Sequence, residues 1–218
     1  MKKVFLLAGL IITTAGAYAQ TISYGVKAGL NLSKLTSSGN GGSVSSETLA
    51  GFHLGGIVDF KFQSFSIQPG ILFSTKGGST SVTSSGTNGG IFTGSISAKT
   101  TLDYIEVPVN FLYRSVAGNG NIFIGAGPYI AFGVSGKSTL DTNINGQPDH
   151  QSENVKFGSA DGEIKNPDFG INALAGYQLN NGFAISAGYG LGLTNLSNKD
   201  NSKVKNQGFN FSLGYFFK

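Results

Sequence analysis

The chain of 218 residues has no cysteine, 34 glycines and only 12% charged residues, with a formal net charge of +4. These values exclude disulfides, zinc–thiolate sites and cysteine nucleophiles. They also argue against helical bundles, because each glycine inside a helix costs about 1 kcal/mol. The 17 phenylalanines and 8 tyrosines supply the apolar surface that a disordered chain lacks, and the small, scattered positive charge predicts no nucleic-acid partner.

The first nineteen residues have the pattern of a secretion signal. A basic start, Met1-Lys2-Lys3, is followed by an apolar stretch at 4–12 and by Ala17-Tyr18-Ala19, a small-residue cleavage site. The apolar stretch is too short to span a bilayer, which takes about 20 residues. We therefore predict a cleaved signal peptide at 1–19 and one domain at 20–218, with export from the cytoplasm.

Beyond the signal, apolar residues recur at every second position, as from Ile22 to Leu32. This period is that of a β-strand with two different faces. No later stretch contains the 18 or so consecutive apolar residues of a transmembrane helix. The alternation predicts eight strands, near 22–33, 51–62, 65–76, 100–114, 121–134, 167–179, 183–195 and 207–217.

The predicted connections alternate between short and long. Those at 63–64, 115–120 and 180–182 are short and turn-like, whereas those at 34–50, 78–98, 135–165 and 196–206 are long and rich in Ser, Gly, Asn and Thr. Short periplasmic turns and longer external loops are typical of bacterial outer-membrane barrels. We expect the four long connections to be solvated, mobile loops.

The residues between the apolar positions indicate which face meets lipid. In the seventh predicted strand they are Ala184, Ser186, Gly188, Gly190 and Gly192, too small to mask a strand from water but suited to the interior of an eight-stranded barrel. The apolar rows then face outer-membrane lipid, with aromatic residues at their ends. The sequence predicts an all-β, eight-stranded, antiparallel up-and-down transmembrane β-barrel. A soluble, lipocalin-like periplasmic carrier with an apolar cavity remains the alternative.

Eight short stretches, in order along the mature chain, carry a resemblance to a known family. They are GVKAGLNLS at 25–33, GFHLGG at 51–56, IQPGILFSTKG at 67–77, YIEVPV at 104–109, GAGPY at 125–129, DFGIN at 168–172, GYGLGLTNL at 188–196 and GYFF at 214–217. With them the chain resembles the PorT-like outer-membrane β-barrel family of Gram-negative bacteria. The resemblance implies an eight-stranded outer-membrane barrel and does not imply an enzymatic activity. One branch of that family is tied to protein secretion.

The C-terminus departs slightly from this resemblance. Barrels of this kind usually end in an aromatic residue, whereas Lys218 follows Phe217 here. Because the alternation is otherwise intact, we expect the outer-membrane insertion machinery to recognise the chain.

The inward rows carry the polar side chains that could hold chemistry. They are Lys27, His53, Asp59, Lys61, Gln68, Glu106, Asn110, Arg114, Asn172 and Gln178. Charges inside a narrow lumen must pair, because burying them alone is costly. We predict a mixed-charge network of Lys27, Asp59, Lys61, Glu106, Asn110 and Arg114 that plugs the barrel. A narrow path for water or small ions, or a catalytic carboxylate pair of Asp59 and Glu106, are alternatives.

Catalysis is not predicted. Only His53 and His150 could serve as imidazole bases, and no nucleophile elbow accompanies either. An enzyme active at the barrel rim remains a minor alternative.

One segment of the third long connection resembles a calcium loop. Asp141, Asn143, Asn145 and Asp149 occupy positions 1, 3, 5 and 9, with Gly146 at the sixth. Position 12 is Ser152 instead of Glu, so any Ca²⁺ binding would be weak, and an Asn/Asp/Gly-rich turn explains the same residues. No other cofactor is predicted. The expected function is structural or binding: a closed barrel that displays external loops to an unknown protein or surface ligand.

Overall fold

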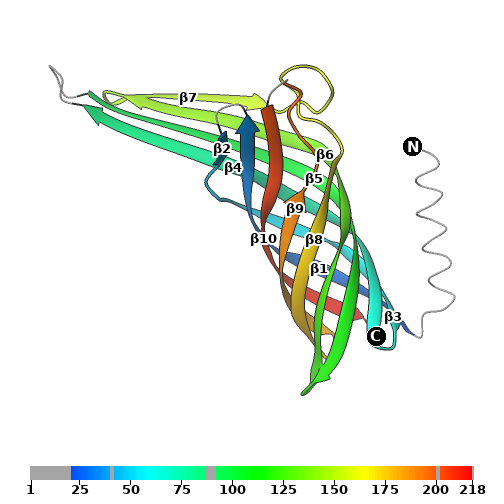
Figure 1. Cartoon of the computed structure of the whole chain (residues 1–218). Helices are drawn as coiled ribbons and strands as arrows, with labels where there is room; N and C mark the ends of the chain where they lie inside the picture. Colours follow the sequence, from blue (N-terminus) through cyan, green and yellow to red (C-terminus); the bar gives the residue numbers. More distant parts are fainter. Residues whose placement is uncertain (1–20, 40–41, 87–91, 200–201, 218) are drawn as a thin grey trace.

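The computed structural model describes residues 21–39, 42–86, 92–199 and 202–217 (Figure 1). The predicted signal peptide and Lys218 lie outside these ranges. No helix of the described residues is long and apolar enough to cross a membrane.

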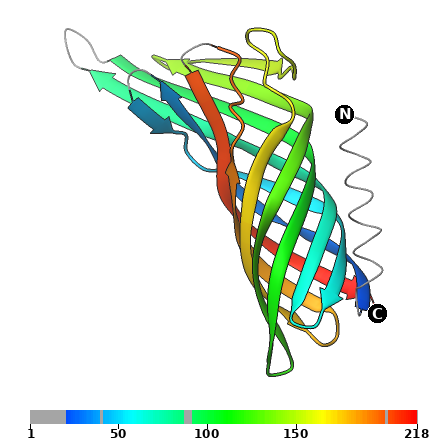
Figure 2. The same cartoon turned by 45° about the vertical axis from the view of Figure 1, so that its right-hand side comes forward.

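The described residues form ten β-strands, eight of which close a ring. The strands are β1 (Thr21–Gly39), β2 (Gly42–Ser45), β3 (Leu49–Phe62), β4 (Phe65–Gly86), β5 (Phe92–Ala117), β6 (Gly120–Ile144), β7 (Gln147–Asn154), β8 (Asp168–Leu179), β9 (Phe183–Gly192) and β10 (Ser202–Phe217). The ring runs β1–β3–β4–β5–β6–β8–β9–β10, and β10 pairs back onto β1 with antiparallel register (Figure 2). The eight-stranded antiparallel barrel predicted from the alternation is confirmed.

Two of the predicted loops are in fact largely strand. β4, β5 and β6 run for 22, 26 and 25 residues, so they include most of 78–98 and the first part of 135–165. In the predicted loop at 34–50, the C-terminal end of β1 pairs with β2 in a hairpin. In the predicted loop at 196–206, β10 already begins at Ser202. The prediction failed because Ser- and Thr-rich strands exposed on both faces lack the apolar row by which strands were recognised, although Thr itself favours strands.

The two faces of the barrel strands separate as predicted. On the outside, Tyr24, Phe65, Ile71 and Leu213 are each more than 60% exposed, as expected of a lipid-facing surface. On the inside, polar residues including Asp59, Gln68 and Glu106 are buried. At the short-turn end, the Phe65 ring contacts Tyr113 edge to face and the Phe183 ring contacts Tyr215 at a tilt, with ring centroids 5.3 and 4.9 Å apart, in agreement with an aromatic girdle.

The interior also holds large apolar side chains, which the sequence interpretation did not place there. Three clusters are buried inside: Ile57, Leu72, Ala184 and Phe216; Leu112, Phe123 and Leu174; and Leu102, Tyr104, Tyr129 and Ala131. Inward glycines make room for them: a Cβ on Gly176 would lie 2.4 Å from the Phe123 ring, and one on Gly170 would lie 2.4 Å from the Tyr129 ring. Large side chains such as Phe123 and Tyr129 thus occupy the space that the neighbouring inward glycines leave free.

A segment after β7 folds back over the long-loop end of the barrel, and we call residues 155–166 the cap segment. Its Val155, Phe157 and Ile164 pack against the cluster that contains Tyr104. Asn198 holds it, since its side-chain amide donates to the carbonyls of Gly158, Ala160 and Glu163 at 2.9–3.1 Å. The cap segment is thus held by apolar contacts and by the Asn198 amide.

Candidate functional site

The lumen near the short turns contains an ion-pair network centred on Arg114. Its Nη2 lies 2.8 Å from Asp59 Oδ2, its Nη1 donates to Gln178 Oε1 at 2.7 Å, and its Nε donates to Ser66 Oγ at 3.0 Å. Lys61 Nζ is 3.8 Å from the same Asp59 oxygen. The structure thus brings together Asp59, Lys61 and Arg114, three of the residues expected in a lumen network, and each nitrogen of the guanidinium group contacts a partner.

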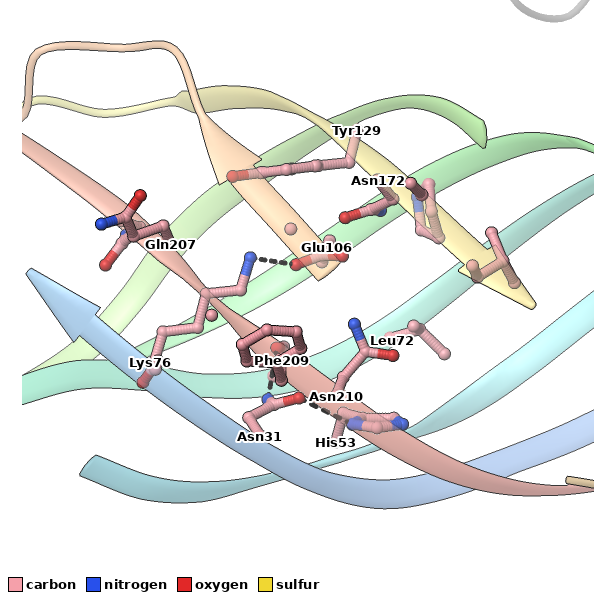
Figure 3. Close-up of a pocket in the computed structure, with 18 of the residues that line it drawn as sticks. Asn31, His53, Leu72, Lys76, Glu106, Tyr129, Asn172, Gln207, Phe209 and Asn210 are labelled. Atoms are coloured by element: carbon pink, nitrogen blue, oxygen red, sulfur yellow. Dashed lines mark hydrogen bonds and ion pairs between the residues drawn. The ribbon is translucent and has the colours of Figure 1, made fainter. Parts of the chain in front are cut away.

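The middle of the lumen is built around His53 (Figure 3). Its Nδ1 lies 2.9 Å from Asn31 Oδ1, and its Nε2 lies 2.9 Å from Ser212 Oγ. The Asn31 amide in turn donates to Ser74 Oγ at 3.1 Å and to the Thr75 carbonyl at 3.0 Å. Both ring nitrogens of this buried histidine are hydrogen-bonded to neighbouring side chains. His53 therefore links β1, β3 and β10, and neither nitrogen is free to bind a substrate.

The outer half of the lumen contains a second ion pair, between Lys76 and Glu106 (Figure 3). Lys76 Nζ also lies 4.3 Å from the centroid of the Tyr129 ring. Because Glu106 pairs here and Asp59 pairs with Arg114, the two carboxylates belong to separate networks. The hypothesis of a catalytic carboxylate pair finds no support in this arrangement.

Two charged members of this region were missed from sequence. Lys76 was placed at the end of a strand, and Asp168 at the start of one. The Asn206 amide donates to Asp168 Oδ2 at 3.0 Å and to the Tyr104 hydroxyl at 3.2 Å. Counting by twos from Gln68 to residue 76, and from Gln178 to residue 168, places both on the inward rows.

A small cavity of about 60 Å³ separates these networks. Lys27, Glu106, Asn110, Asn172 and Asn210 are among the residues that line it. This volume holds a few water molecules, since one water needs about 10–15 Å³ on this measure. Lys27 lies in the electrostatic field of Glu106 but forms no contact ion pair within the described part of the chain.

The segment that resembled a calcium loop is a tight β-hairpin. Asn145 and Gly146 have φ values of 52° and 81°, which are those of a two-residue type I′ turn. Asp141 pairs with His150 and Thr142 pairs with Asp149, so the Asp149 side chain lies on the opposite face from Asp141. The four predicted ligand residues do not converge. Within the described ranges no group of three or more His, Asp or Glu residues is placed to hold a metal ion.

Three strands of the ring, β4, β5 and β6, continue beyond it, and β7 pairs with β6 to complete a four-stranded sheet (Figures 1 and 2). The described β3–β4 pairing reaches Ser74 and the β6–β8 pairing reaches Ala131, yet β4 pairs with β5, and β5 with β6, well past these residues. A membrane-spanning strand needs about 9–11 residues. We call the continuation, residues 79–86, 92–101, 136–144 and β7, the projecting sheet.

One face of the projecting sheet carries exposed apolar side chains. Val82 lies opposite Ile96, Ile96 lies opposite Thr142, and Leu140 and Ile144 flank Thr142 on the same face. Val82, Ile96, Leu140 and Ile144 are 59%, 49%, 37% and 49% exposed. We call these four residues the apolar patch. The other face carries hydroxyl and polar residues.

The closed ring, the lipid-compatible outer rows and the polar interior define an outer-membrane β-barrel protein of Gram-negative bacteria. The sequence matches the family described as outer membrane protein beta-barrel domain over residues 18–198, and the chain belongs to this family.

Solved structures show distant likenesses to the barrel. The attachment invasion locus protein Ail of Yersinia pestis, solved with a heparin analogue, is 15% identical, with 91% of this chain and 100% of that chain covered at a TM-score of 0.38. Neisserial surface protein A is 11% identical, with 91% and 100% covered at 0.41. The Escherichia coli outer membrane protease OmpT is 9% identical, with 89% and 97% covered at 0.30. No curated protein matches the sequence. None of these likenesses assigns a function to the chain.

Proposed function

We propose that this protein is a closed barrel of the PorT-like kind that binds a partner outside the cell through its projecting sheet. The observation that carries the proposal is the apolar patch, four exposed side chains on strands that extend beyond the span of a membrane. Contiguous exposed apolar surface that lipid does not cover marks interaction sites. Outer-membrane barrels have their short turns on the periplasmic side and their long connections outside the cell. The projecting sheet lies at the end opposite the short turns, so we assign it to the external side.

Three features support a lumen that is closed to flow. The Arg114 and Lys76 ion pairs occupy two levels of the interior, buried apolar clusters occupy further parts of it, and the cap segment packs on the cluster that contains Tyr104. The cavity of about 60 Å³ does not amount to a path through the barrel. We expect no conductance in planar bilayers, and discrete current steps at physiological salt would contradict a closed lumen.

The same features favour the membrane barrel over a soluble carrier. A lipocalin-like carrier needs an apolar cavity inside and a polar surface outside, whereas here buried polar groups are inside and exposed apolar rows are outside. Membrane extraction that requires detergent, together with heat-modifiable gel mobility, is the expected behaviour. Release by osmotic shock would refute it.

Site-specific photo-crosslinking on intact cells tests the binding role. A photoreactive residue in place of Ile144, within the apolar patch, should form an adduct with a second protein or a surface glycan. One in place of Thr139, on the opposite face, is the matched control and should give much less. If no position on the projecting sheet forms an adduct, the binding proposal fails.

A further inference from the structure

The projecting sheet has two edges, and they are built differently. The β7 edge carries Pro148, Asp149 and Glu153, the kinds of residue that prevent another strand from pairing. The β4 edge, from Thr80 to Gly86, contains neither a charged residue nor a proline. Within the described residues, no strand pairs with β4 on that side beyond Ser79.

The backbone of the β4 edge is oriented to accept a strand. Ser79 exchanges hydrogen bonds with Glu47, through Glu47 N to Ser79 O at 2.6 Å and Ser79 N to Glu47 O at 3.3 Å, so its N–H and C=O point away from β5. In an antiparallel ladder this orientation recurs at every second residue. Ser81, Thr83 and Ser85 therefore also direct their N–H and C=O groups to the open side.

We propose that the β4 edge at residues 81–85 binds an extended peptide segment of a partner protein, which adds a strand to the projecting sheet. We call the open position beside residues 81–85 the slot. It is next to the place where Glu47 pairs with Ser79, and there the chain that pairs with β4 turns away into the β1–β2 hairpin. Addition of a strand to a sheet edge gives affinity through main-chain hydrogen bonds and specificity through alternate side chains. The inference deepens the proposed binding function and rests on it.

The surroundings of the slot define the chemistry of the added segment. On one face it would lie beside Val82, which continues into the apolar patch through its β5 neighbour Ile96, and this favours apolar side chains at alternate positions. On the other face it would lie beside the hydroxyls of Ser81 and Thr83. At one end it meets the exposed carboxylate of Glu47, whose Oε1 accepts a hydrogen bond from Ser81 Oγ at 2.7 Å, so a Lys or Arg at that end is favoured.

Proline substitutions on the two edges provide a matched pair of variants. Thr83→Pro removes an N–H group that points to the open side and leaves the β4–β5 hydrogen bonds in place. Ser152→Pro makes the same change on the β7 edge. The backbone orientation repeats every second residue, so Ser152, four residues after Pro148, has the same outward orientation. Heat-modifiable mobility checks that both variants fold.

The probe is a phage-displayed library of random nine-residue peptides, selected against the full chain in lipid nanodiscs. We expect enriched peptides to alternate apolar and small polar residues, with a basic residue near one end. A labelled synthetic copy of the most enriched peptide should bind Thr83→Pro at least tenfold more weakly than wild type, and Ser152→Pro within twofold. Bound peptide should also slow amide hydrogen exchange at Ser81 and Thr83.

Several outcomes would overturn the inference. It fails if no peptide is enriched, if Thr83→Pro binds as well as wild type, or if exchange at Ser81 and Thr83 is unchanged. Sedimentation without peptide that shows a dimer abolished by Thr83→Pro would make a second copy of this chain the occupant instead. If peptides bind independently of Thr83→Pro but are lost with Ile144→Thr, only the edge inference fails and the proposed binding function stands.

Discussion

Arg114 and Asp59 form a direct ion pair inside the lumen, with Nη2 and Oδ2 2.8 Å apart and the two side chains 7% and 0% exposed. They come from β5 and β3, which are not neighbours in the ring, because β4 lies between them. The pair therefore links the two strands that flank β4 on the inside of the barrel. A buried pair contributes little by itself, but the loss of one partner leaves a buried charge without compensation.

Asp59→Asn should destabilise the barrel by about 3–5 kcal/mol, because it leaves the Arg114 charge buried without a counter-charge. The measurement is the urea midpoint of refolding into lipid vesicles, followed by gel mobility. Asp149→Asn removes the same charge from an exposed hairpin residue and should shift the midpoint little. Equal effects of the two substitutions would show that the lumen pair has no special role.

Gly176→Ala should destabilise the barrel by about 1–3 kcal/mol through overpacking. The added Cβ would lie 2.3 Å from the carbonyl oxygen of Ile185 and 2.4 Å from the Phe123 ring, and the backbone oxygen has no room to move. Gly56→Ala is the matched control, since no heavy atom lies within 4 Å of its Cβ position. The same refolding assay compares them, and similar midpoints would contradict the packing argument.

Much of the barrel could be predicted because its strands have two unlike faces. The period-two alternation that placed Phe65 and Ile71 outside and Gln68 inside needs only local sequence, and the closed ring confirms those placements. The register, which brings Arg114 to Asp59, depends on which strands become neighbours. That is a property of the closed sheet and not of any one segment.

The projecting sheet and the cap segment could not be predicted in the same way. Residues 80–83 are exposed on both faces of the strand, and Val82 is a single apolar residue in a polar run, so the sequence there shows no alternation. Phe157 and Ile164 are two isolated apolar residues in a long connection, and their role becomes visible only when they pack on Tyr104. Inward glycines were interpreted as space for a narrow interior, but their large partners, such as Phe123, lie on neighbouring strands.

Asn198→Ala should release the cap segment while the barrel stays folded. The side chain donates three hydrogen bonds to cap carbonyls, and their loss costs about 2 kcal/mol at about 1 kcal/mol or less for each bond. Local opening should then become at least fivefold more frequent. Trypsin cleavage after Lys156 or Lys165 on intact cells measures it.

Asn154→Ala serves as the control for the cap experiment, since it replaces an exposed asparagine at the end of β7. Its rate of trypsin cleavage should match wild type. If Asn198→Ala is cleaved no faster than Asn154→Ala, the three hydrogen bonds do not hold the cap segment.

Engineered disulfides test the hairpin against the calcium loop, because the natural chain contains no cysteine to interfere. In a two-residue hairpin Ile144 and Gln147 form a hydrogen-bonded pair, so Asp141 and His150 form a non-hydrogen-bonded pair, with Cα atoms about 4.5 Å apart. Asp141→Cys with His150→Cys should therefore oxidise readily, since disulfides need Cα atoms within about 7 Å and Cβ atoms that face each other.

Asp141→Cys with Asp149→Cys is the contrasting variant. These positions lie on opposite faces of the hairpin, so their Cβ atoms point apart and the pair should stay reduced under the same oxidant. In a calcium loop, positions 1 and 9 instead converge on one ion, which would bring residues 141 and 149 together. Quantification of free thiols by mass after mild oxidation separates the two structures. Millimolar Ca²⁺ should change neither the oxidation pattern nor the melting temperature of the wild-type protein. Preferential oxidation of the 141–149 pair would refute the hairpin.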